Sequence, residues 1–195
     1  MVSNGLRLEP VSQSLLIFTV VFPADAVGYP GREDDYEAFD KKLPNEVING
    51  INLSCGTHAF ANVNGMSISL LSQSLKNTNG ISVAGFFSKS FRSNGFQAAF
   101  GNAASCCFKG VLLAIIATNA CRGRGLQLAL LCNKYINFKG LQISILNGIN
   151  KGEKSFTGLQ MGLINNTNKL RGIQIGLLNR NEKQILPFIN WNFKN

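Results

Sequence analysis

Few side chains in this chain are of a kind that carries out chemistry. The chain has one histidine, His58, and no serine or cysteine stands with it in a recognisable catalytic motif. The acidic run at residues 31–42 (GREDDYEAFDKK) lacks the spacing of a calcium-binding loop, and adjacent carboxylates of this kind are typical of a solvated linker. The stretch at residues 122–125 (RGRG) lacks the Lys-Ser/Thr pair of a phosphate-binding loop.

Cysteines and carboxylates do not supply a catalytic site either. The five cysteines are odd in number and irregular in spacing, which argues against a disulfide framework and fits no zinc motif. We expect reduced, partly buried thiols, and Cys106 and Cys121 could stack because they are fifteen residues apart. Between Glu46 and Arg180 the only acid is Glu153, so no carboxylate pair can be assembled. We therefore predict that the chain is not an enzyme and has no catalytic, cofactor-binding or metal-binding residues and no cofactor.

Positive charge is the one chemical feature with a pattern. The net charge is +9, and residues 100–195 hold twelve Lys or Arg against two acids, whereas residues 1–99 hold seven against eight. Basic residues precede regularly spaced glycines in the second half, and the candidate polyanion-binding residues are Lys109, Arg124, Lys139 and Arg171. The expected partners are an acidic glycan, lipopolysaccharide or an acidic protein. The alternative is that the basic residues only keep the surface of the rod soluble and prevent side-by-side association. Nucleic acid is the least expected partner, because no stacking aromatic residues alternate with the basic ones.

The elements that position these charges are set by a repeat. Seven glycines from Gly50 to Gly140 lie fifteen residues apart, and Gly158 and Gly172 continue the series after gaps of eighteen and fourteen. A fixed period of this length is typical of stacked-repeat architectures. We expect each repeat glycine to adopt a backbone conformation that a Cβ would forbid.

Each glycine is followed by alternating side chains. The positions one, three and five residues after it are apolar in 26 of 27 cases, which indicates a strand with one buried face. The positions between hold mainly Gln, and then Ala, Ser or Gly, and we expect these to form the outer face. A further apolar position lies two residues before the glycine in most copies.

Stacked copies of such a repeat predict an all-β protein, a β-solenoid of about nine 15-residue coils with caps at both ends. The predicted divisions are an N-terminal capping strand and acidic linker (1–47), the solenoid (48–180) and a C-terminal cap (181–195). Residues 147–155 are expected to form a loop between coils. A β-sandwich of hairpins and an outer-membrane β-barrel remain as alternatives, although barrel strands need about ten residues.

The ends leave further alternatives. The apolar run at residues 14–22 (SLLIFTVVF) is either a capping strand or, with Ala24 and Ala26 resembling a cleavage site, part of a signal peptide. The small residues of the expected outer face could pack two copies as a homodimer. Those residues are Ala84, Ala99, Ala114 and Ala129.

The last two copies, at residues 158–165 (GLQMGLIN) and 172–179 (GIQIGLLN), and the ending at residues 186–193 (LPFINWNF) resemble a family of bacterial surface-repeat-containing proteins. The resemblance covers about three quarters of the chain and implies a bacterial origin and a place in the cell envelope or outside the cell, against a cytoplasmic alternative. It supplies no functional residues. We therefore expect a non-catalytic repeat protein that offers a binding or scaffolding surface.

Overall fold

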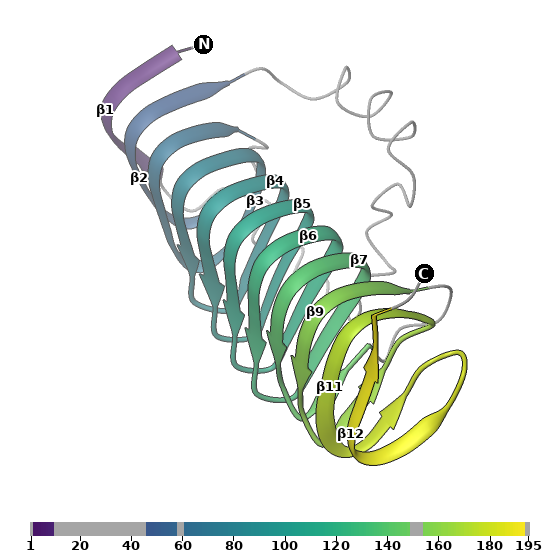
Figure 1. Cartoon of the computed structure of the whole chain (residues 1–195). Helices are drawn as coiled ribbons and strands as arrows, with labels where there is room; N and C mark the ends of the chain where they lie inside the picture. The colour runs from purple at the N-terminus through teal and green to yellow at the C-terminus, as the bar shows by residue number, and fades with distance from the viewer. Residues whose placement is uncertain (1, 10–45, 58–60, 149–153, 194–195) are drawn as a thin grey trace.

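The computed structural model describes residues 2–9, 46–57, 61–148 and 154–193. They form one sheet of twelve strands that coils into a rod (Figure 1). His58, the acidic run at 31–42 and the apolar run at 14–22 lie outside the described residues. The strands are β1 (Val2–Glu9), β2 (Val47–Thr57), β3 (Asn62–Ala84), β4 (Phe87–Ala99), β5 (Asn102–Ala114), β6 (Ala117–Ala129), β7 (Cys132–Ile143), β8 (Leu146–Asn147), β9 (Ser155–Met161), β10 (Ile164–Asn166), β11 (Lys169–Arg180) and β12 (Ile185–Asn192).

The predicted β-solenoid is confirmed. Consecutive strands from β2 to β7 pair in parallel with a shift of fifteen residues, except at Gly56 and Thr57, where the shift is sixteen. Each of the remaining paired residues therefore lies beside its counterpart one repeat later. The short strands β8 and β10 complete the coils around the irregular spacings near Gly158. Among the described strands only β11 and β12 pair antiparallel, which argues against the barrel alternative, in which neighbouring strands are antiparallel.

Glycines sit at one corner of every coil. The nine repeat glycines have φ between +123° and +148°, and each lies beside the next in the strand pairing. A Cβ added to any of them would lie 2.0–2.4 Å from the carbonyl oxygen of the glycine one coil earlier. Both the backbone angle and this close approach exclude a larger residue, as the sequence predicted.

The assignment of inner and outer faces was wrong, and the structure inverts it. Gln97, Gln127, Gln142, Gln160 and Gln174 are fully buried inside the rod. The residues one, three and five after each glycine instead lie on the outside, half-buried or exposed. Alternation has the same period on both faces, so the pattern alone does not say which face is inside.

The buried glutamines satisfy one another. Gln142 Nε2 donates to Gln127 Oε1 at 2.6 Å, Gln160 to Gln142 at 2.8 Å and Gln174 to Gln160 at 2.8 Å. A second interior series joins Asn133, Asn147, Asn165 and Asn179. A buried amide is tolerated when its donors and acceptors are paired, and stacking identical amides one coil apart provides that pairing.

Several of the largest buried apolar side chains lie two residues before the glycine. Phe138 and Phe156 stack with ring centroids 5.8 Å apart, and Phe108 stacks on Phe138 at 6.2 Å across the coil that holds Gly123. A Cβ on Gly123 would lie 2.4 Å from the Phe138 ring, so the two phenylalanines occupy the space of its missing side chain. Tyr135 packs edge-on against Phe156.

Both ends of the rod add strands that continue its pattern. In β1, Gly5 lies beside Gly50 with φ +102°, so residues 2–9 form a repeat copy that the fifteen-residue spacing did not reveal. At the other end β12 pairs with β11 and places Asn190 inside, where its Nδ2 donates to Gln174 at 2.9 Å. At the ends of the loop predicted at residues 147–155, Asn147 instead lies in β8 and Ser155 in β9, and residues 149–153 lie outside the described residues.

The glycine corner can be tested by adding one methyl group. We expect Gly125→Ala to lower the free energy of unfolding by about 3 kcal/mol, because left-handed strain adds to a clash with the Gly110 oxygen. Gly5→Ala is the matched control, since its φ is also positive but nothing lies within 4 Å of the added Cβ. Urea unfolding followed by circular dichroism measures both. Equal losses of unfolding free energy in the two variants would contradict a role for the close approach to the Gly110 oxygen.

The inverted faces can be tested on two adjacent residues. Gln127→Leu should lower the unfolding free energy by about 2–4 kcal/mol, because it removes the buried hydrogen bonds that Gln127 makes with Thr118, the Lys134 carbonyl and Gln142. Leu128→Gln, on the outer face, should change it by less than about 0.5 kcal/mol. Thermal and urea unfolding of the two variants give the comparison. The opposite ranking would restore the face assignment that hydrophobicity alone suggests.

Candidate functional site

The predicted basic residues lie in one line on the surface. Strand pairing places Lys109 beside Arg124 and Arg124 beside Lys139, and all three side chains are exposed. Thr157 follows, and then the exposed Arg171. Adjacent parallel strands are about 4.8 Å apart, so the three consecutive cations repeat at about that distance. We call Lys109, Arg124, Lys139 and Arg171 the basic edge.

A second row lies two residues earlier on the same strands. Arg92 pairs with Cys107, Cys107 with Arg122, and Arg122 with Asn137, and Lys169 pairs with Ser155 further along. Residues two apart on a strand point to the same side, so Arg92, Arg122 and Lys169 accompany the basic edge. None of these three cations is among the polyanion-binding residues predicted from the sequence.

The line of the basic edge changes character along the rod. In the N-terminal coils the same position holds asparagines whose side chains hydrogen-bond in series. Asn49 donates to Asn4, Asn64 to Asn49, Asn79 to Asn64 and Asn94 to Asn79, each at 2.9 Å. The asparagine row therefore satisfies itself, whereas the basic edge that continues it is a line of like charges.

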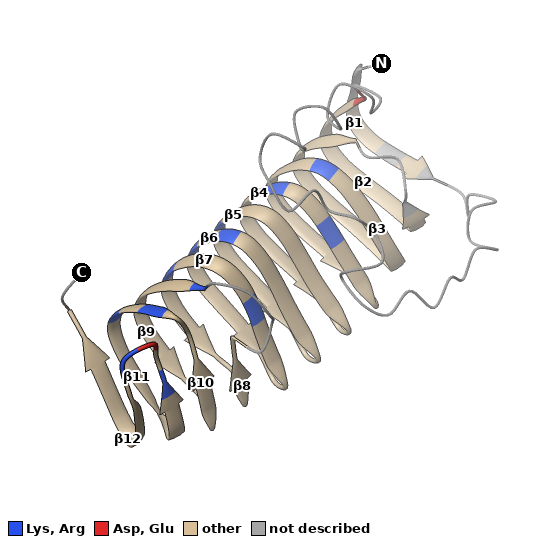
Figure 2. Cartoon of the chain, turned by 90° about the vertical axis from the view of Figure 1, so that its right-hand side faces the viewer, with Lys and Arg blue, Asp and Glu red and all other residues tan. Residues whose placement is uncertain are grey.

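Acidic residues are placed away from this edge. Of residues 46–57, 61–148 and 154–181, Glu46 is the only acid. Figure 2 shows most Lys and Arg of the coils gathered along one long edge of the rod, with Asp and Glu only near its two ends. The described residues of the coils that carry the basic edge therefore include no carboxylate that would cancel its field.

The small residues predicted to form a dimer surface are buried inside the rod. Ala84, Ala99, Ala114 and Ala129 are between 4 % and 8 % exposed, because they share the inner face with the glutamines. The correction follows directly from the inverted faces. A contact between two copies would have to use another part of the rod.

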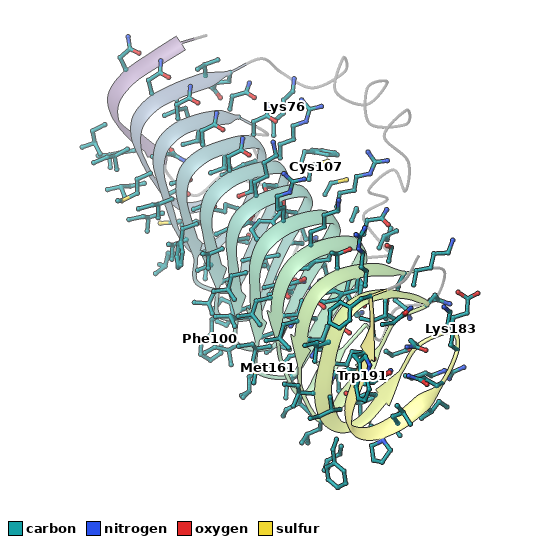
Figure 3. All side chains as sticks on the ribbon, in the orientation of Figure 1. Lys76, Phe100, Cys107, Met161, Lys183 and Trp191 are labelled. Atoms are coloured by element: carbon teal, nitrogen blue, oxygen red, sulfur yellow. The ribbon has the colours of Figure 1, made fainter. Side chains whose placement is uncertain are left out.

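The outer face contains a continuous apolar surface that the sequence reasoning placed inside. It is most exposed five residues after each glycine, where the side chains are 38–68 % exposed in Leu70, Phe100, Ile115, Leu130, Ile145, Leu163 and Leu177. Figure 3 shows Phe100 and Met161 on the side of the rod away from Lys76 and Cys107. We call the outward residues one, three, five and six after each repeat glycine the apolar face.

The cysteines are all free and half-buried in the described structure. Cys106 and Cys121 stand at the same place on neighbouring coils, as predicted, and their thiols are hydrogen-bonded. The hydrogen bond with Cys107 lowers the pKa of Cys106, but the bond with Cys121 and burial outweigh it and raise this pKa to about 12. The same bond from Cys106 lowers the pKa of Cys121, against the effect of burial.

Other chemistry is not assembled by the residues that the structure describes. They contain no cluster of three or more His, Cys, Asp and Glu side chains suited to a metal ion. Within the same residues there is no apolar helix long enough to cross a bilayer. Burial raises the pKa of Tyr135, whose hydroxyl accepts a hydrogen bond from Gln160 at 2.8 Å inside the rod.

Comparison of the chain with protein-family models, with curated proteins and with solved structures finds no match.

The cysteine pair predicts an order of reactivity. At pH 7.5 iodoacetamide should modify Cys121 before Cys106, since the lower pKa gives Cys121 more thiolate at that pH. Mass spectrometry of tryptic peptides over time measures both sites, and Cys132, whose pKa is raised by burial, serves as the internal reference. Faster modification of Cys106 would contradict the assigned direction of the hydrogen bond.

Proposed function

We propose that this chain is a non-catalytic repeat protein that binds polyanions through the basic edge, in the bacterial cell envelope. The observation that carries the proposal is the strand register, which aligns Lys109, Arg124 and Lys139 on consecutive coils. The acidic glycans, lipopolysaccharides and acidic proteins expected from the sequence all present the anionic groups that such a line would attract.

The spacing of the basic edge supports a ligand that is itself extended. Two unit charges about 5 Å apart repel by about 1 kcal/mol in water, so each pair along the line destabilises the bare rod. A linear anion that lies along the edge would neutralise several cations at once and remove this repulsion. Small anions would do so only one at a time, at the cost of more translational entropy.

The envelope location depends on the resemblance of the C-terminal repeats to bacterial surface-repeat-containing proteins. A rigid rod with a repeated surface also suits a scaffolding role, because each coil presents the same groups to a repetitive partner. The chemistry of the partner is specified only as polyanionic.

The experiment replaces the three consecutive cations. The combined variant Lys109→Gln, Arg124→Gln, Lys139→Gln should bind heparin at least tenfold more weakly than the wild type in 0.15 M salt. Wild-type affinity should itself fall steeply between about 0.05 and 0.3 M salt, because bound counterions are released on association. Isothermal titration calorimetry with size-fractionated heparin measures both effects.

A charge-matched control separates the edge from net charge. The variant Lys89→Gln, Lys134→Gln, Lys183→Gln also removes three positive charges, but from positions outside the basic edge. It should retain affinity within about threefold of the wild type, because only the general field is weakened. Equal losses in the two triple variants would exclude the basic edge as the binding site.

A further inference from the structure

On one side of the rod, polar side chains point inward and apolar side chains point outward. Along the strands after the glycine, the inward side chains are Gln, Asn, Ser or Ala, apart from Leu112 and the glycines at 162 and 176, and the outward ones are mostly Leu, Ile, Val, Phe or Met. A soluble strand with one solvated face normally has the reverse arrangement. Polar groups that are satisfied inside and apolar groups that point outside are suited to contact with an apolar phase.

The apolar face runs along all the repeat coils, and among its positions only Gly56, Gly85 and Gly101 have no side chain. It continues through the cap, because Trp191 of β12 lies opposite the outward Ile173 and Ile189 lies opposite Ile175. With strands about 4.8 Å apart and about 3.3 Å per residue, the face measures about 45 Å by 17 Å. That area of about 750 Å² exceeds the largest apolar patch of a typical soluble monomer, about 300–600 Å².

The basic edge borders this face along the glycine corner. Lys109 and Val111 flank Gly110, and Lys139 and Leu141 flank Gly140, so the exposed cation and the first residue of the apolar face are two residues apart on each coil. Cations that border an apolar surface match the chemistry of an anionic bilayer, in which phosphates lie immediately outside the hydrocarbon.

We propose that the apolar face seats on the surface of an anionic lipid bilayer, with the basic edge on the headgroup phosphates. This inference rests on the proposed function, since it names an anionic lipid surface as the polyanion. The rod would lie along the membrane, with its apolar side chains at the boundary between headgroups and acyl chains. Trp191, which is 59 % exposed, would enter the same boundary at the C-terminal end.

Flotation with vesicles tests the proposed contact with an anionic bilayer directly. The wild type should float with phosphatidylcholine vesicles that contain phosphatidylglycerol, and at least tenfold less with phosphatidylcholine alone. The variant Leu130→Thr, Leu163→Thr, Leu177→Thr should lose at least tenfold in flotation while keeping its heparin affinity. Threonine is chosen because it preserves strand propensity at positions that are 49–62 % exposed.

Two controls keep the result interpretable. The variant Asn64→Thr, Asn79→Thr, Asn94→Thr makes the same number of outward changes beyond the apolar face and should float like the wild type. Fluorescence of Trp191, the only tryptophan, should shift to the blue when anionic vesicles are added to the unmodified protein. The fluorescence measurement does not depend on the folding of any variant.

The outcomes are distinguishable from those of the proposed function. If the wild type binds heparin but shows neither flotation nor a fluorescence shift, the proposed bilayer contact is overturned and the polyanion proposal stands. A wild type that is dimeric by light scattering, does not float, and becomes monomeric when Leu130, Leu163 and Leu177 are replaced would also overturn it, with a second copy as the occupant. A wild type that binds neither heparin nor anionic vesicles would overturn both proposals.

Discussion

The rod depends on one close approach, that of each repeat glycine to the carbonyl oxygen of the glycine one coil earlier. No other residue could stand there, because a Cβ would lie 2.0–2.4 Å from that oxygen. The approach holds every coil in register with the next, and the register in turn decides which side chains become neighbours. The basic edge, the amide series and the apolar face are all consequences of that alignment.

Much of this could be predicted from the sequence. The spacing of the glycines was sufficient to predict the solenoid. The residues before the glycines were sufficient to predict that Lys109, Arg124 and Lys139 lie in line, because parallel in-register stacking places residues one repeat apart side by side. Gly5 was missed since the segment after it interrupts the fifteen-residue series. The motif Asn-Gly followed by alternating leucines at residues 4–8 (NGLRL) was the signal that could have found it.

The inner and outer faces could not be predicted in the same way. Hydrophobicity alone assigns apolar residues to the inside, but here the interior beside the strand is filled mainly by alanines and by glutamines that bond to one another. The recurring Gln two residues after the glycine was the available signal. A residue that must meet its own copy one coil away varies less than one that faces outward, where Phe96, Val111 and Leu126 replace one another.

Function follows from the same asymmetry. Since the interior glutamines are hydrogen-bonded, the strand after the glycine can present an apolar surface while leaving few buried polar groups unpaired. The strand before the glycine carries the charges, so one corner separates two surfaces of opposite character. The proposals of a polyanion-binding edge and of a lipid-facing side describe the two sides of that corner.

The interior amide series also have a direction. In the glutamine series each side chain donates to the coil before it, from Gln142 to Gln127 onward, whereas in the asparagine series Asn133, Asn147 and Asn165 donate to the coil after them. The aligned dipoles of the two series therefore oppose each other along the axis. Unlike an α-helix, whose peptide dipoles add along the axis, the coils that carry both interior series each contribute two amide dipoles that oppose each other.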